Sequence, residues 1–162
     1  MPPPPPFPSL DAFYIHLLRS CASLRHAAAV HGHVARAHPA SSLFLRNSLL
    51  AAYCRLGGPF PARRLLDEMP RRNAVSFNLL IDAYSREGLV YLSLETFVTA
   101  RRAGVSVDRF SYAAALAACS RAGELRAGKA VHALAVLDGL SSGVFVSNSL
   151  LSMYARCGEA GV

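Results

Sequence analysis

The segment that decides the fold reads NSLLAAYCRLG at residues 47–57. It returns as NLLIDAYSREG at residues 78–88 and as NSLLSMYARCG at residues 148–158. All three copies fit the outline N-x-[LI]-[LI]-x-x-Y-x-R-x-G, and their starts are separated by 31 and then 70 residues, the second being twice 35. Self-similarity at this spacing is the signature of a protein built from stacked structural repeats.

Two further segments fill the intervals between these copies. Residues 14–24 and 112–125 both begin with an aromatic residue and contain a later cysteine, and the pairs Val30-His31 and Val131-His132 follow at matching places. The start of the chain, Met1 to Pro8, is nearly all proline and cannot form a helix, and we expect residues 1–10 to be disordered. The remainder, 11–162, divides into five units of about 11–42, 43–73, 74–108, 109–143 and 144–162.

Each complete unit is predicted to form a helix, a short turn and a second helix. In the third unit, a helix over 75–86 places apolar residues on one face, and Gly88 ends it. A second helix over 89–103 is expected to end at Gly104. Glycines are expected to end helices in other units as well, at Gly57, Gly123 and Gly158, and residues 59–61 are expected to form a turn. Because one pair cannot bury its apolar face alone, the units are predicted to stack into an all-α solenoid.

Net charge, cysteine spacing and the length of apolar runs limit the classes of partner that the chain could bind. The formal net charge is +7, which suits a polyanionic partner and equally fits a protein with a merely cationic surface. The four cysteines lack the close, paired spacing of a metal or disulfide framework and are predicted to be buried hydrophobes: Cys21, Cys54, Cys119 and Cys157. No apolar run approaches about 18 residues, so no membrane partner is expected. The cysteine spacing gives no reason to expect a metal, and no cofactor is expected either.

Three segments carry a family resemblance. They are VSFNLLIDAY at 75–84, SCASL at 20–24 with VHGH at 30–33, and VFVSNSLLSMYARCG at 144–158. Together they resemble the pentatricopeptide repeats of plant organelle proteins, in the subclass that alternates ordinary (P), longer (L) and short (S) repeats. The resemblance implies a right-handed α-α superhelix whose five units read L, S, P, L and a truncated S. Unit one departs from the pattern by being about three residues short between Leu24 and Val30.

The resemblance also implies a modular reading of RNA, with one base per repeat. The reading residues would be the fifth and the last of each repeat, which here are Asn47 with Asn73, Asn78 with Asp108, and Asn148. By the family's code, Asn with Asp favours uridine, and Asn with Asn favours pyrimidines. Units one and four carry Ile15 with Ser42 and Ala113 with Gly143 instead, and are expected to be spacers.

The second residue of each repeat would wedge between neighbouring bases. These residues are Phe44, Val75, Phe110 and Phe145, and stacking on an aromatic ring contributes roughly 1–3 kcal/mol per base. A simpler interpretation stays open for both sets. An asparagine near a helix start is often an N-cap, and the phenylalanines would then belong to the core between repeats.

The sequence gives little support for catalysis. The six histidines are scattered, and a zinc deaminase would need H-x-E with P-C-x-x-C, which the sequence lacks. Related editing proteins carry a deaminase-like domain ending in Asp-Tyr-Trp, and we expect none here because the sequence has no tryptophan. The chain is therefore predicted not to be an enzyme and to have no small-molecule substrate.

The leading hypothesis is sequence-selective binding of single-stranded organellar RNA that marks a site for RNA-editing or processing proteins. Two alternatives are a helical-repeat scaffold for protein partners and a non-functional, truncated gene product. Truncation is expected because the sequence ends at Val162, about where the second helix of unit five should begin. This would leave four residues partly uncovered: Leu150, Leu151, Met153 and Tyr154. The family implies a mitochondrion or chloroplast, although the targeting signal is weak, with an acid at Asp11 before the first arginine.

Overall fold

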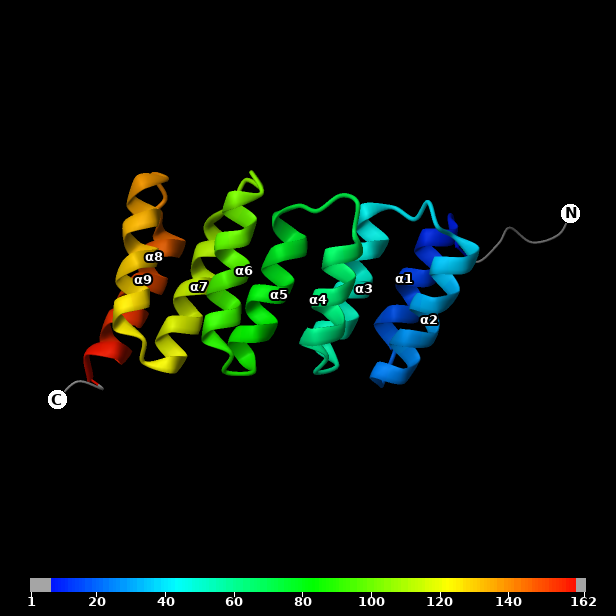
Figure 1. The fold of residues 1–162 in the computed structure, drawn as a ribbon, viewed down its shortest axis with the longest axis horizontal. Helices are drawn as coiled ribbons and strands as arrows, with labels where there is room; N and C mark the ends of the chain where they lie inside the picture. The colour runs from blue at the N-terminus through cyan, green and yellow to red at the C-terminus, as the bar shows by residue number, and fades with distance from the viewer. Residues whose placement is uncertain (1–6, 160–162) are drawn as a thin grey trace, which may run out of the picture. The chain divides into compact units, whose positions relative to one another are not determined.

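The computed structural model describes residues 7–159, and within that range every regular element is an α-helix. The chain divides into two compact units, Met1–Arg71 and Arg72–Val162, each described by itself. The helices are labelled in Figure 1 and follow the order α1 (Leu10–Ser20), α2 (Leu24–Ala37), α3 (Leu43–Arg55), α4 (Pro59–Glu68), α5 (Ala74–Arg86), α6 (Val90–Arg102), α7 (Arg109–Ala122), α8 (Leu125–Leu137) and α9 (Val144–Glu159).

The helices α1 to α8 come in pairs joined by short turns, as predicted. In the pair α5–α6, both observed helices match the predicted boundaries to within one residue. The turn between them contains Gly88 at a φ of 74°, and Gly104 follows α6 at a φ of 70°. Because this left-handed conformation strongly favours glycine, these positions end the helices where the sequence places glycine.

A polar N-cap fixes the start of four of the odd-numbered helices. The caps of α1, α3, α5 and α7 each accept a hydrogen bond from a backbone N–H of the first turn, and they are Ser9, Ser42, Asn73 and Asp108. Such a cap contributes about 1 kcal/mol. The caps also set the register of each helix, and therefore which side chains face the neighbouring helices.

In the second unit the helices form two layers. Helix α7 packs against both α5 and α9, which gives one layer of odd-numbered helices. Helix α6 contacts α5 and α7, and α8 contacts α7 and α9, which gives the other layer. The largest buried side chains include Phe77, Tyr84, Phe97, Tyr112 and Leu116. Burying an apolar side chain of this size contributes about 1.5–3 kcal/mol to stability. These side chains form the core of the second unit.

The first unit repeats this arrangement with fewer helices. Helix α1 packs against α3, while α2 contacts both of them and α4 packs on α3. Its core includes Tyr14, Leu18, Leu45, Leu50 and Leu66. The predicted fold class, an all-α solenoid of helix–turn–helix repeats, is confirmed in the construction of each unit.

Three expectations about the elements are wrong. Gly158 does not end a helix, since α9 continues to Glu159 and Gly158 lacks the positive φ of the helix-ending glycines. Residues 59–61 are the first turn of α4 and not a turn before it, because proline is tolerated where the backbone N–H groups have no helical partner. Leu150 and Met153 are 7% and 0% exposed, since α7 and α8 pack on α9.

The two ends of the chain are described only in part. Of the segment 1–10, residues 1–6 lie outside the described residues, while the ring of Phe7 lies 5.5 Å from that of Phe13 in α1. Leu151 is 69% exposed, and Tyr154 is half-buried. The helix expected to begin near Val162 lies outside the described residues as well.

The cysteines behave as predicted. All four are buried, and none of them forms a disulfide: Cys21, Cys54, Cys119 and Cys157. Burial raises the pKa of the Cys119 thiol to about 11, so it is protonated and unreactive at neutral pH. Among residues 7–159, no helix is both long and apolar enough to cross a membrane.

Candidate nucleic-acid interface

Asn78 and Asp108 lie 30 residues apart in sequence and meet in space. Asn78 is on α5, and Asp108 is the N-cap of α7, which packs beside α5. The Asn78 Nδ2 donates a hydrogen bond to the Asp108 Oδ1 at 3.2 Å. The fifth and last residues of unit three are therefore the one predicted pair that the structure brings into direct contact within a single compact unit.

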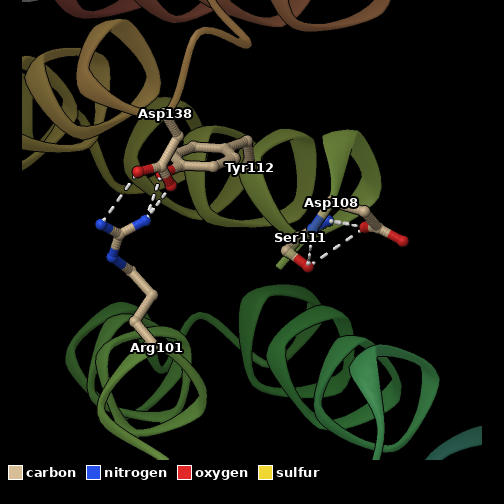
Figure 2. Close-up of polar contacts among 5 residues, drawn as sticks. All are labelled: Arg101, Asp108, Ser111, Tyr112 and Asp138. Carbon is tan, nitrogen blue, oxygen red and sulfur yellow. Dashed lines mark hydrogen bonds and ion pairs between the residues drawn. The ribbon is translucent and has the colours of Figure 1, made fainter. Parts of the chain in front are cut away.

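Asp108 is held in place by the first turn of its own helix. Its Oδ1 accepts hydrogen bonds from the backbone N–H groups of Phe110 and Ser111 at 3.0 Å, and from the Ser111 hydroxyl at 3.1 Å. Figure 2 shows the Asp108 carboxylate with Ser111 beside it. Burial would raise the pKa of Asp108, but the hydrogen bonds from Ser111, Asn78 and Phe110 outweigh it and hold the pKa below its usual value. The carboxylate is therefore ionised at neutral pH.

The amide of Asn78 carries an acceptor without a partner. Its Oδ1 is buried and has no hydrogen-bond partner among the described residues. The amide cannot turn over to relieve this, because its oxygen would then face the carboxylate of Asp108. A buried acceptor left without a partner costs about 1–3 kcal/mol. The orientation of the Asn78 amide is therefore fixed, with its Nδ2 directed at Asp108 and its Oδ1 buried.

The predicted wedge residues are large apolar side chains on the surface. The exposed fraction is 66% for Phe44, 51% for Val75, 49% for Phe110 and 47% for Phe145. The interpretation that they belong to the core between repeats is therefore wrong. The rings of Phe110 and Phe145 meet edge to face with centroids 5.1 Å apart, and the guanidinium of Arg109 lies 4.9 Å from the Phe110 centroid.

A hollow of about 400 Å³ lies between α7 and α9. Asn148 lines it together with Phe145 and two arginines, Arg121 and Arg156. Ser120 also lines it, and this side chain is only 8% exposed while its hydroxyl oxygen has no hydrogen-bond partner among the described residues. The hollow thus combines an amide, an aromatic ring and two cations around an unsatisfied hydroxyl.

The two arginines were not singled out from the sequence as site residues. The repeated outline places an arginine at the same position of three units, unit four carries Arg121 at the matching position, and these arginines make different contacts. Arg55 donates to the backbone oxygens of Leu18 and Cys21 at the end of α1, and Arg86 pairs with Asp82 at 3.0 Å. Of these four arginines, only Arg121 and Arg156 line the hollow. The repeat pattern alone could not distinguish them from Arg55 and Arg86.

The remaining predicted readers have different surroundings. Asn73 is exposed and caps α5, where its Oδ1 accepts from the Ser76 backbone N–H at 3.1 Å. The N-cap interpretation is therefore confirmed for Asn73. Asn47 is 8% exposed within α3, and it belongs to a different compact unit from Asn73. Asn148 is exposed on α9.

The reading positions of the two expected spacer units carry no amide or carboxylate. Ser42 caps α3, and Ile15 is half-buried in α1. Ala113 lines the hollow beside Asn148, and Gly143 lies in the loop before α9. None of these side chains could read a base edge as an asparagine can.

Two histidines form matching contacts with tyrosines. The His31 Nδ1 is 3.1 Å from the Tyr53 hydroxyl, and the His132 Nδ1 is 2.8 Å from that of Tyr154. Each contact joins an even-numbered helix to the next odd-numbered one, so these histidines support packing between repeats. Across residues 7–159, no three His, Cys, Asp or Glu side chains gather as metal ligands would.

The stacked helix pairs, which carry an amide–carboxylate pair and exposed apolar side chains at registered positions, define a helical-repeat protein. Comparison with known proteins gives the family. Residues 44–73 and 75–105 match the family model of the PPR repeat. A pentatricopeptide repeat-containing protein of Arabidopsis thaliana is 41% identical over 80% of the chain. The chain belongs to the pentatricopeptide repeat family.

Further relatives and a solved structure agree. A putative mitochondrial pentatricopeptide repeat-containing protein of Arabidopsis thaliana is 36% identical over 90% of the chain, and a chloroplastic one is 32% identical over 88%. The crystal structure of the pentatricopeptide repeat protein PPR10 from maize superposes with a TM-score of 0.76 over 91% of the chain and 22% of that structure, at 16% identity, and so shares the fold. The chain spans about a fifth of the curated relatives it matches, covering 17%, 24% and 17% of these three.

Proposed function

We propose that the chain binds single-stranded RNA and selects a base at unit three through Asn78 and Asp108. The observation that carries the proposal is the hydrogen bond between these two side chains, which come from successive repeats. An amide donor and a carboxylate acceptor held together at a fixed distance are suited to the Watson–Crick edge of an unstacked base.

The donors and acceptors of the pair are compatible with uracil. One N–H of the Asn78 Nδ2 is directed at Asp108, which leaves a second N–H on that nitrogen. The hydrogen bonds from α7 and Asn78 converge on the Asp108 Oδ1, so Oδ2 is the oxygen available to a base N–H. Uracil offers a carbonyl oxygen beside an N–H, which matches this donor and acceptor. The choice of uridine over the other bases rests on the family's code, which assigns uridine to Asn with Asp.

The apolar side chains beside the pair provide a stacking surface. Val75 precedes Asn78 on α5, and Phe110 follows Asp108 on α7, both about half exposed. Phe44 and Phe145 occupy the same place in units two and five. In this proposal they stack on neighbouring bases and contribute affinity without regard to sequence, roughly 1–3 kcal/mol for each aromatic contact.

Positive charge supplies the part of the affinity that does not depend on sequence. The chain carries a formal charge of +7, and Arg121 and Arg156 line the hollow that holds Asn148. Arginine guanidinium groups next to a base-reading amide are suited to the phosphates on either side of that base. We also propose three further base-reading residues, Asn47, Asn73 and Asn148. The order of the repeat types, L, S, P, L and S, is proposed as well.

The names of the relatives support a biological setting for the chain. Several carry mitochondrial or chloroplastic in their names, so we propose that the chain acts in the RNA metabolism of one of these organelles. In this role it would mark a short, pyrimidine-containing site for proteins that edit or process RNA. The site groups described here bind and orient a base, and the proposal assigns them no catalytic step.

Binding is tested by fluorescence anisotropy with the full chain and labelled 12-nucleotide RNAs at two salt concentrations. The expected result is salt-sensitive binding to pyrimidine-bearing RNA, weaker for duplex RNA and for single-stranded DNA. Asn78→Ala should weaken binding to a uridine-bearing RNA at least threefold, whereas the matched exposed change Glu95→Gln on α6 should not. Equal affinity for single-stranded and duplex RNA, or no binding at low salt, would contradict the proposal and favour a protein-binding scaffold.

A further inference from the structure

Three side chains from three helices meet at one end of the second unit. Arg101 lies in the last turn of α6, Tyr112 in the first turn of α7, and Asp138 directly follows α8. The Arg101 Nη1 donates to the Tyr112 hydroxyl at 2.6 Å, and its Nη2 donates to the Asp138 Oδ1 at 3.2 Å. The Tyr112 hydroxyl donates in turn to the Asp138 Oδ2. We call these three residues the anchor cluster, and Figure 2 shows the guanidinium facing the carboxylate beside the tyrosine ring.

The anchor cluster is buried at Tyr112 and partly exposed at its two charged groups. Tyr112 is 0% exposed, and its ring packs edge to face on that of Phe97 in α6, with centroids 5.1 Å apart. The side chains of Arg101 and Asp138 are 25% and 27% exposed. Hydrogen bonds from Arg101 and Tyr112 lower the pKa of Asp138, so the carboxylate stays ionised. Charge-assisted hydrogen bonds in partly buried surroundings hold their partners in one geometry.

Tyr112 connects the anchor cluster to the base-reading pair. Its backbone N–H donates to the backbone oxygen of Asp108 at 3.2 Å, in the first turn of α7. Ser111, the residue before it, closes the capping box around the Asp108 carboxylate. The same turn of helix thus carries Asp108 at one end and a buried phenol fixed to α6 and α8 at the other.

Asn78, in contrast, lies on α5, which contributes no side chain to the anchor cluster. The distance between Asn78 and Asp108 therefore depends on how the start of α7 lies against α5 and α6. Binding constellations work when their members are held within about 0.5 Å by supporting residues. Arg101 fastens the end of α6 to α7 across the loop 103–107, which leads directly into Asp108.

We propose that Arg101, Tyr112 and Asp138 are positioning residues that hold Asp108 within hydrogen-bonding distance of Asn78 and so set the base selectivity of unit three. The claim about base selectivity rests on the proposed function. The claim about geometry, that the cluster holds Asp108 near Asn78, can be tested without RNA. None of the three residues is required to touch the base, and loss of the cluster should reduce discrimination between bases more than overall affinity.

The geometric part is tested without RNA, by NMR of the Asn78 side-chain amide in the isotope-labelled full chain. Asp108→Ala defines the amide signals of an Asn78 without its partner. Tyr112→Phe and Asp138→Asn should shift the signals towards those values. The control is Ser93→Ala, which removes a buried hydrogen bond of 2.8 Å from α6 to the Ile81 backbone oxygen of α5 but spares the cluster. Unchanged Asn78 signals in both cluster variants would overturn the inference.

The selectivity part is tested by anisotropy with RNAs that differ only in uridine or adenosine at one position. Tyr112→Phe should reduce the ratio of the two affinities at least threefold, with less than a twofold change in affinity for the adenosine RNA. Ser93→Ala should leave the ratio of the two affinities unchanged, even if it lowers the melting temperature as much as Tyr112→Phe does. An unchanged ratio in Tyr112→Phe would overturn the inference. If the wild-type protein shows no preference, the proposed function fails, and the amide signals alone decide whether the cluster positions Asp108.

Discussion

At the scale of single residues, Asp108 has two roles that can be separated. It caps α7 by accepting from the backbone N–H groups of Phe110 and Ser111, and it receives the amide of Asn78. Asn73 holds the corresponding cap of α5 with an amide oxygen in place of a carboxylate. Asparagine and aspartate are about equal as caps, so the charge of Asp108 is not needed for folding.

Because the capping role of Asp108 does not need its charge, two substitutions at this position should affect stability differently. Asp108→Ala should lower the free energy of unfolding by about 1 kcal/mol, because the cap of α7 is lost. Asp108→Asn should change the stability by less than half as much, since its amide oxygen can still cap the helix. Urea denaturation followed by circular dichroism measures both. An equal loss in the two variants would show that the carboxylate charge, and not the cap, stabilises the start of α7.

His31 predicts a dependence of stability on pH. Burial lowers its pKa below the usual 6.5, with Glu68 opposing the shift and Arg46 adding to it. The folded state therefore binds a proton less readily than the unfolded state, so the contribution of His31 is present above about pH 6.5 and is lost as the pH falls through the folded-state pKa. Relative to His31→Gln, the wild-type protein should lose melting temperature between pH 7.5 and 5.5. Parallel curves for the two proteins would contradict this assignment.

The sequence predicted some site residues and missed others for physical reasons. Asn78 and Asp108 could be paired because their positions in successive repeats are fixed by the repeat length. Ser120, Arg121 and Arg156 were missed because what distinguishes them is a hollow between two helices, which no local pattern encodes. The anchor cluster could not be predicted either, since its members come from three helices and their contact depends on how the helix ends meet.

At the scale of elements, glycine allows α8 to approach α9 closely. A Cβ added at Gly128 would lie 2.4 Å from the Met153 Sδ, and Met153 is fully buried. In α2 the nearest atoms to a Cβ at Gly32 belong to the flexible Arg36 side chain, at 3.6 Å. The two helical glycines therefore have opposite surroundings, although both lie on even-numbered helices.

This contrast predicts opposite effects of the same substitution. Gly128→Ala should destabilise the protein by about 1–3 kcal/mol, because the methyl group overpacks the contact with Met153. Gly32→Ala should be neutral or stabilise by up to about 1 kcal/mol, because alanine favours the helix and meets only ordinary contacts. Thermal unfolding of both variants is the measurement. A stabilised Gly128→Ala would mean that Met153 moves aside without cost.

Helix boundaries were predictable where glycine and caps coincide with the end of the apolar pattern, as in α5 and α6. The prediction failed at Gly158 because glycine at a helix end does not by itself stop the helix. It also failed for Leu150 and Met153, whose burial comes from α7 and α8 together. A sequence shows which residues are apolar, but their burial depends on neighbours that pack from two sides.

At the scale of the whole molecule, the charge of +7 predicts how binding responds to salt. For single strands, each neutralised phosphate adds about 0.7 to the slope of the logarithm of affinity against the logarithm of salt concentration. Arg156→Gln should reduce that slope by about this amount. Lys129→Gln, an equal change of charge at an exposed residue of α8, should leave it nearly unchanged. Equal reductions would show that binding reflects net charge and not the hollow between α7 and α9.

The measurement that tests the central claim most directly is the preference of one repeat for uridine or cytidine before and after Asp108→Asn. The full chain would be titrated with two RNAs that differ only at the nucleotide assigned to unit three. We predict that the wild-type protein binds the uridine RNA more tightly, and that Asp108→Asn shifts the ratio towards cytidine at least threefold while the fold stays intact. An unchanged ratio in a folded variant would contradict base reading by Asn78 and Asp108.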